Sequence, residues 1–98
     1  MTIAQLIKVF NEHRGDEFLK FDRIVNKLSQ RPDLHAFMLL DSLVPETSDI
    51  ISDAQHDEIF LEVSLKDLAK VVLVEQVVDL IRCGVRHEGD YGCLAMFS

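Results

Sequence analysis

The segment 64–85, SLKDLAKVVLVEQVVDLIRCGV, constrains the fold more than any other part of this chain. Ser64 is placed to cap a helix, and apolar residues follow it at helical spacing. The β-branched run 71–74 weakens helix propensity, so we expect a turn there and then a second helix that Gly84 ends. One continuous helix over 65–83 is the alternative. The inward-facing residues of the two predicted helices are Leu68, Ala69, Val72, Val77, Val78 and Ile81.

Strands are predicted on both sides of this helical pair. The run 58–63, EIFLEV, is rich in β-branched and aromatic residues, and the tail 85–97 has the pattern of a hairpin with Gly89, Asp90 and Gly92 as turn residues. From residue 59 the order is therefore strand, helix, helix, hairpin. This order resembles a winged helix-turn-helix, in which the first strand joins the hairpin in a small antiparallel sheet. The resemblance covers roughly the last forty residues and includes no diagnostic motif.

The first half of the chain is predicted to be helical. Residues 2–5 match a capping box, and Gly15 is well placed to end the helix that follows. A second helix is predicted over 16–29, and a third between Pro32 and Pro45, which should be the most buried. The apolar residues of the second helix are Phe18, Phe21, Ile24, Val25 and Leu28, and those of the third are Leu34, Phe37, Met38, Leu40 and Leu43.

The length of 98 residues fits a single domain over 1–98. We expect a mainly helical α+β fold, in which N-terminal helices (1–44) precede an acidic loop (45–58) and a winged-helix-like strand-helix-helix-hairpin unit (59–98). The acidic loop could hold one helical turn, because residues 52–55 again match a capping box.

The charge is unevenly distributed along the chain. The net charge is −7, and residues 1–44 are balanced, with six basic and six acidic residues. Residues 45–98 carry four basic and eleven acidic residues, so the second half repels phosphates and suits a basic protein surface, or serves solubility. Six acids follow one another with no Lys or Arg between them: Glu46, Asp49, Asp53, Asp57, Glu58 and Glu62.

The outer face of the last predicted helix is unsuited to DNA. Its exposed candidates are Glu75, Gln76, Asp79 and Arg82, of which only Arg82 would approach a phosphate favourably. Direct nucleic-acid binding is therefore not expected from this face. The alternative is a basic stripe on the predicted second helix, formed by Lys20, Arg23, Lys27 and Arg31.

Catalytic and metal-binding patterns are weak. Cys83, His87 and Cys93 could offer three ligands to zinc, but they lack a close Cys pair and a fourth ligand, so both cysteines are better interpreted as small apolar residues. His35 is expected to be a packed or edge residue, and His56 a loop residue. Asp49, Asp53 and Asp57 would line one face if they were helical, but they lack the pattern of a calcium loop. We expect no enzyme activity, no cofactor and no metal.

The chain has the pattern of a cytoplasmic protein. No apolar run approaches the length of a membrane span, and the first residues do not have the pattern of a signal peptide. Two cysteines are too few for a disulfide scaffold.

These observations favour protein binding. We expect a small acidic module that docks on the basic surface of another protein, such as a regulator, an inhibitor, a phage-type (viral) modulator or a nucleic-acid mimic. One alternative is a winged-helix DNA-binding transcriptional regulator, for which a homodimer is one possible state. The other is a structural or assembly subunit whose third predicted helix packs between copies of the chain. The expected docking residues are Asp49, Asp53, Asp57, Glu58, Glu62, Glu75 and Asp79.

Overall fold

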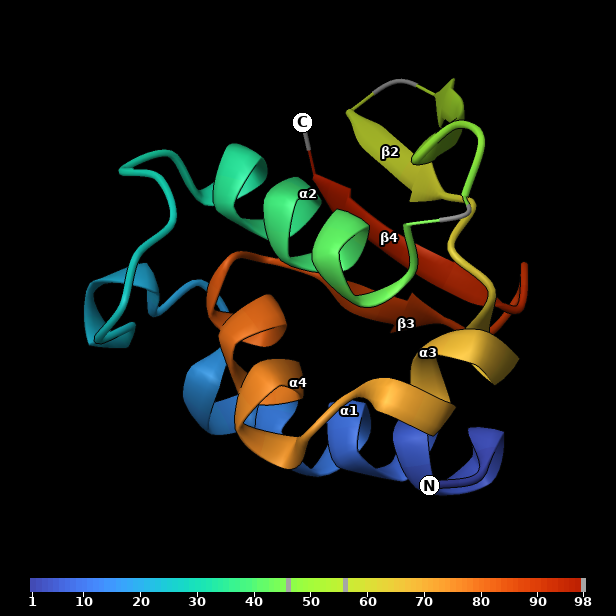
Figure 1. The fold of residues 1–98 in the computed structure, drawn as a ribbon, viewed down its shortest axis with the longest axis horizontal. Coiled ribbons are helices and arrows are strands. Elements are labelled where there is room, and N and C mark those ends of the chain that lie inside the picture. Colours follow the sequence, from blue (N-terminus) through green and yellow to red (C-terminus); the bar gives the residue numbers. More distant parts are fainter. Residues whose placement is uncertain (46, 56, 98) are drawn as a thin grey trace.

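The described part of the chain folds into four α-helices and a four-stranded antiparallel sheet (Figure 1). The computed structural model describes residues 1–45, 47–55 and 57–97. The strands lie in the order β1-β2-β4-β3, so β2 and β4 are central. The expected α+β class with helices in the first half is confirmed. In chain order the elements are α1 (Ile3–Glu17), the 3-10 turn η1 (Phe21–Arg23), α2 (Pro32–Leu43), β1 (Ile51–Gln55), β2 (Glu58–Leu61), α3 (Leu65–Val71), α4 (Val74–Arg82), β3 (Arg86–Glu88) and β4 (Cys93–Phe97).

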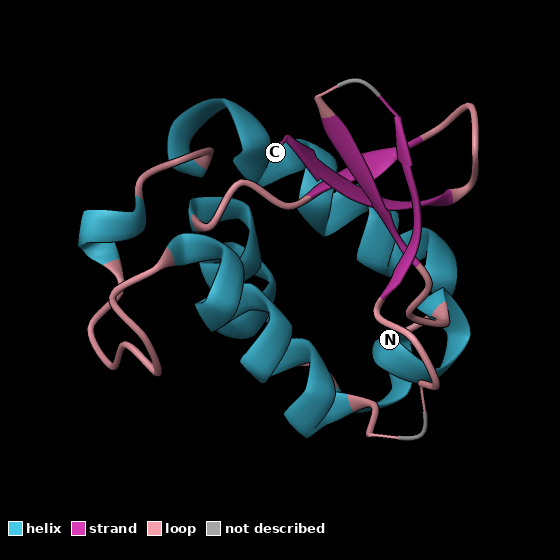
Figure 2. Ribbon diagram, turned by 90° about the horizontal axis from the view of Figure 1, so that it is seen from above, coloured by secondary structure: helices cyan, strands magenta, loops and turns pink. Residues whose placement is uncertain are grey.

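The helices and one face of the sheet enclose the hydrophobic core. Helix α1 packs on α3, α4 and β3, and α2 packs on α4. Figure 2 shows the strands gathered at one side of the molecule, with helices over the rest. Alternate strand residues point to opposite faces, so Leu61, Leu94 and Met96 join the core while Phe60 and Ala95 are buried outside it. The largest fully buried side chains are Leu6, Phe10, Leu40, Leu61, Leu68, Val77, Leu80, Ile81, Val85 and Leu94.

The segment 64–85 forms two helices, as predicted. Ser64 caps α3 by accepting a hydrogen bond from the backbone N–H of Asp67 at 3.3 Å. Helix α3 ends at Val71, and α4 begins at Val74 after a short break in the β-branched run. No helix within the described residues is both long enough and apolar enough to cross a membrane.

The end of α4 packs against Leu19, which follows α1 in the N-terminal part of the chain. Gly84 has φ of 98°, a left-handed conformation that glycine adopts without steric cost. Leu19 also has a positive φ, 64°, and its N–H donates to the Ile81 carbonyl at 3.2 Å. A Cβ on Gly84 would lie 2.8 Å from Cδ2 of Leu19. Glycine at position 84 therefore provides both the backbone turn and the space for Leu19.

The predicted helix over 16–29 is wrong. Helix α1 continues through Gly15 to Glu17, and only the short η1 turn follows before α2. Val25 has 89% of its surface exposed, although the predicted stripe placed it inward. Tertiary contacts override the local helical pattern here: Ile24 is buried in the core, and the N–H of Leu28 donates to Nδ1 of His35 at 3.0 Å.

Helix α2 agrees with the prediction in its bounds but not in its burial. His35, Ala36 and Leu40 are buried, whereas Leu34 and Met38 are 44% and 42% exposed. The helix was expected to be the most buried because apolar residues surround it. Only one stripe of it faces the core, so the opposite apolar residues meet solvent.

The acidic loop contains a strand where a helical turn was considered. Residues 51–55 form β1, which pairs with β2, and the register shifts between Ile51 and Asp53. The hydroxyl of Ser52 donates to the Phe60 carbonyl at 3.2 Å across this irregularity. Pairing with the strongly β-forming β2 explains why a polar segment of low strand propensity becomes a strand. Glu46 and His56, named from the sequence, lie outside the described residues.

We expect Leu80→Ala to lower the free energy of unfolding by about 2–5 kcal/mol, because Leu80 is fully buried and the substitution leaves a cavity. Val25→Ala is the matched control and should change that free energy by no more than about 0.5 kcal/mol. Urea denaturation followed by circular dichroism measures both. Comparable losses in the two variants would contradict the placement of Val25 in solvent.

We also expect the free energy of unfolding to fall as the pH drops from about 7.5 to 5.5. Burial lowers the pKa of His35, with Lys27 adding to the effect and Asp79 opposing it. The unfolded chain therefore binds a proton first in this window, and stability rises with pH. His35→Asn keeps an acceptor for the Leu28 N–H but cannot titrate, so its pH dependence should be flatter. Equal slopes in both proteins would refute this account.

Candidate protein-binding surface

Four of the predicted acids lie on or beside the β1–β2 hairpin. Asp53 is in β1, Asp57 is in the turn before β2, and Asp49 and Glu62 flank the two strands. All four are exposed, and none forms an ion pair with another described residue. Asp49, Asp53 and Asp57 do not line one face of a helix, because residues 51–55 form a strand. We refer to Asp49, Asp53, Asp57 and Glu62 as the hairpin carboxylates.

Glu58 has a structural partner. Its carboxylate accepts a hydrogen bond from the guanidinium of Arg86, whose side chain is only 4% exposed. The same terminal nitrogen lies 3.6 Å from Glu88, and the guanidinium carbon lies 4.2 Å from the ring centroid of Phe97. Because Arg86 is buried, Glu58 compensates a charge that would otherwise be costly in the fold. Glu58 is therefore less available to a partner than its neighbours.

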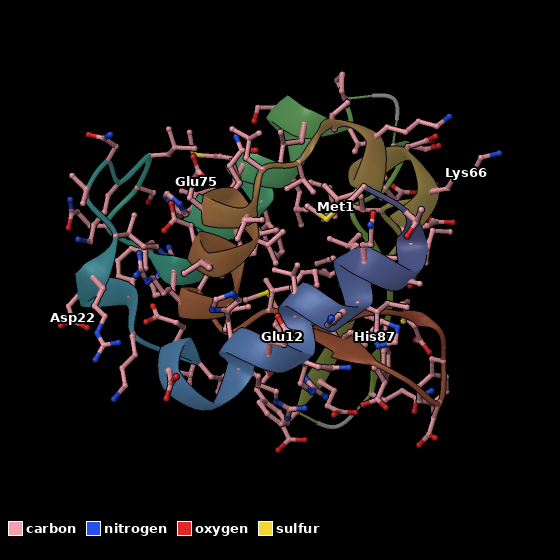
Figure 3. All side chains as sticks on the ribbon, turned by 90° about the horizontal axis from the view of Figure 1, so that it is seen from below. Met1, Glu12, Asp22, Lys66, Glu75 and His87 are labelled. Atoms are coloured by element: carbon pink, nitrogen blue, oxygen red, sulfur yellow. The ribbon has the colours of Figure 1, made fainter. Side chains whose placement is uncertain are left out.

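The two remaining predicted residues belong to another part of the surface. Glu75 is exposed near the start of α4, and Asp79 pairs with Arg82 at 3.1 Å one turn later. Figure 3 shows Glu75 and Lys66, which lies at the start of α3, on opposite sides of the molecule. Since β2 leads into α3, the hairpin carboxylates and Glu75 do not form one continuous patch.

Arg82, the cation expected to face a phosphate, is already paired. Its Nε lies 2.5 Å from Oε2 of Glu17, and Arg23 approaches the other oxygen of that carboxylate at 2.9 Å. The hydrogen bond from Arg82 lowers the pKa of Glu17. Desolvation of the carboxylate acts in the opposite direction, and Arg23 also lowers the pKa. The outer face of α4 therefore offers no free cation among the described residues.

The predicted basic stripe does not exist as one helical face. Nζ of Lys27 donates to the carbonyl of Ile24 at 2.8 Å and lies 5.3 Å from the centroid of Phe21. Arg31 lies 3.7 Å from Asp33. Arg23 lies in η1, and Lys27 and Arg31 lie in the irregular segment before α2, where these three side chains interact with nearby acids or carbonyls.

The two cysteines are free thiols. Cys83 is buried at the end of α4, where desolvation, helped by Asp79, raises its pKa to about 12. Burial raises the pKa of Cys93, and the negative charge of Glu88 raises it further. The positive charge of Arg86 acts in the opposite direction. Both thiols are therefore protonated at neutral pH. The described residues include no group of three His, Cys, Asp or Glu side chains arranged to hold a metal ion.

A pocket beside the hairpin carboxylates was not expected from the sequence. It has a volume of about 410 Å³ and lies between β1, the β2–α3 segment and the β3–β4 turn. Asp53 opposes Phe60 in the β1–β2 register, and Tyr91 from the turn packs on Phe60 with ring centroids 4.8 Å apart. Asp53 and Glu62 both line this pocket. No sequence pattern connects Tyr91 to β1, because their place in one pocket depends on the β1-β2-β4 pairing.

Comparisons of this chain with models of protein families, with curated proteins and with solved structures found no match. Its function is therefore argued from the residues described above.

We expect Glu58→Gln to lower the free energy of unfolding by about 1–3 kcal/mol, because it leaves the buried charge of Arg86 with weaker compensation. Asp57→Asn, one residue earlier, should change it by no more than about 0.5 kcal/mol. Chemical denaturation of the two single variants beside the wild type measures the difference. If Asp57→Asn proved as costly as Glu58→Gln, the distinction between structural and free carboxylates would not hold.

Proposed function

We propose that this protein is an acidic protein-binding module that docks its hairpin carboxylates on a basic surface of another protein. The observation that carries the proposal is the exposure of Asp49, Asp53, Asp57 and Glu62 on one hairpin without ion-pair partners among the described residues. Of the other acids predicted to dock, Glu58 and Asp79 are engaged within the fold, whereas Glu75 is exposed on α4.

Electrostatics would govern such an encounter. Clustered negative charge accelerates association with a positive surface and disfavours partners of like charge. Exposed charges are screened by salt, with a Debye length of about 8 Å at physiological ionic strength, so the affinity should fall as salt rises. The net charge of −7 extends the same preference to the whole molecule.

A nucleic-acid-binding protein is the partner class that best suits this charge. Its basic groove is built to receive phosphates, and a row of exposed carboxylates can occupy the same positions. A protein acting in this way would be a regulator or an inhibitor, as phage-type modulators are. We place it in the cytoplasm, where its two free thiols remain reduced, and assign it no catalytic role.

A winged-helix DNA-binding regulator is the second candidate. The order β2, α3, α4, β3, β4 and the strand neighbours β2-β4-β3 favour a winged-helix-like arrangement. The chemistry opposes DNA binding by that unit, because Glu75 is exposed on α4 and Arg82 is neutralised by Glu17 and Asp79. Duplex binding that survives physiological salt would favour this candidate over the first.

An assembly subunit is the third candidate. Leu34 and Met38 occupy neighbouring turns of α2 and are both half exposed, so copies of the chain could pack there. Light scattering over a wide concentration range separates this candidate from the others. A mass that stays monomeric at every concentration argues against it.

We expect the triple variant Asp49→Asn, Asp57→Asn, Glu62→Gln to lose the partner while keeping its fold. The matched control is Asp16→Asn, Asp22→Asn, Asp41→Asn, which removes three exposed negative charges elsewhere and should retain the partner. Affinity capture from source-cell lysate at low and moderate salt, followed by mass spectrometry, compares the two with the wild type.

The outcomes separate the candidates. Loss of a basic protein in the first variant alone supports docking through the hairpin. Equal capture by all three proteins rules out the hairpin carboxylates as the docking surface. Capture of DNA by the unmodified protein supports the winged-helix regulator, and recovery of this chain alone supports assembly.

A further inference from the structure

The pocket beside β1 combines an aromatic wall with acidic residues. Tyr91 and Phe60 form the aromatic part, and Asp53 and Glu62 contribute the carboxylates. No Lys or Arg lines it among the described residues. Its volume of about 410 Å³ lies within the range of roughly 300–1,000 Å³ that is typical of sites for small groups. The pocket is therefore suited to a cation that also has a flat apolar surface.

The strand register brings these groups together on one face of the sheet. Asp53 and Phe60 are direct partners across β1 and β2, so their side chains lie on the same face. Glu62 follows Phe60 by two residues, which returns it to that face. Phe60 pairs in turn with Ala95 of β4, and this places it beside the β3–β4 turn that carries Tyr91.

Phe60 and Asp53 are held in place by other protein groups, whereas Tyr91 and Glu62 remain available to a ligand. Phe60 is buried and supports the Tyr91 ring, which is 62% exposed. The Asp53 carboxylate accepts hydrogen bonds from the N–H of Ala54 at 2.8 Å and from the side-chain amide of Gln55 at 3.0 Å. Both bonds fix its orientation without neutralising its charge. The Glu62 carboxylate has no ion-pair partner among the described residues.

We propose that this pocket binds the side chain of an arginine presented by the basic partner. The guanidinium would stack on Tyr91 and direct its N–H groups to Asp53 and Glu62. Arginine fits better than lysine because its cation is planar, weakly hydrated and able to stack on an aromatic ring while bonding carboxylates. The inference rests on the proposed function, and it turns a general attraction between charges into recognition of one residue.

The defining experiment uses a short glycine-serine peptide with a single central arginine. Its control peptide carries citrulline, which has the same shape without the charge. Titration of the ¹⁵N-labelled full chain is followed by NMR chemical shifts. We expect saturable shifts at Asp53, Phe60, Glu62 and Tyr91, with binding about tenfold weaker for citrulline. Equal affinity for both peptides, or the absence of saturable shifts, overturns the proposal.

Variants of Tyr91 test the stacking itself. Tyr91→Leu keeps an apolar side chain but removes the ring, so the affinity for the arginine peptide should fall about threefold or more, while Asp53 and Glu62 still favour arginine over citrulline. Tyr91→Phe keeps the ring and should retain the full affinity. Tyr91 is exposed, so neither change threatens the fold. An affinity for the arginine peptide that is unchanged in Tyr91→Leu contradicts arginine stacking.

The proposed function and this inference fail separately. If Tyr91→Leu captures the basic partner as the wild type does, while the triple variant at Asp49, Asp57 and Glu62 does not, docking stands and the arginine pocket is overturned. If capture is unchanged in both variants, the proposed function fails. If both variants lose the basic partner, and the wild type binds the arginine peptide more tightly than the citrulline peptide, the results support both proposals.

Discussion

The antiparallel pairing of β2 with β4 is the interaction on which the rest of the structure depends. It joins residues 58–61 to residues 93–97 and places each strand at the centre of the sheet. On one face Leu61 and Leu94 complete the core beneath the helices. On the other face the same pairing brings Glu58 to Arg86 and Phe60 to Tyr91. The helical core and the candidate binding surface therefore share one set of backbone hydrogen bonds.

Two groups of acidic residues have different physical roles. Glu17, Glu58 and Asp79 compensate arginines that are partly or fully buried, so their charges belong to the fold. The hairpin carboxylates are exposed, and none of them forms an ion pair with another described residue. Of these two groups, only the second is free to contribute electrostatic free energy to an encounter. The net charge alone does not make this distinction.

The parts of the fold that follow from local signals could be predicted from the sequence. The Ser64 cap, the β-branched break and Gly84 define α3 and α4, and the glycines of the tail define the last hairpin. The segment 18–31 could not be predicted, because contacts with α4 and α2 determine its path. Strand β1 was missed for a related reason, since its polar sequence becomes a strand only beside β2.

The candidate site was predictable only in its charge. A run of acids without lysine or arginine predicts an exposed acidic surface, and four of the residues fit it. The partner of Glu58 lies 28 residues away, and no spacing rule predicts that contact. The aromatic pocket depends on three strands and a turn, so it became visible only with the tertiary structure.

Strand β1 is an edge strand that packs on β2 alone among its main contacts. Its residues are exposed throughout, and the helical core is complete without them. The side chains of β1 can therefore be exchanged with little effect on folding, provided that the backbone pairing with β2 is kept. Sequence divergence is therefore tolerated most readily here, and exchanges in β1 would alter the Asp53 side of the binding surface while Arg86 and Glu58 stay fixed.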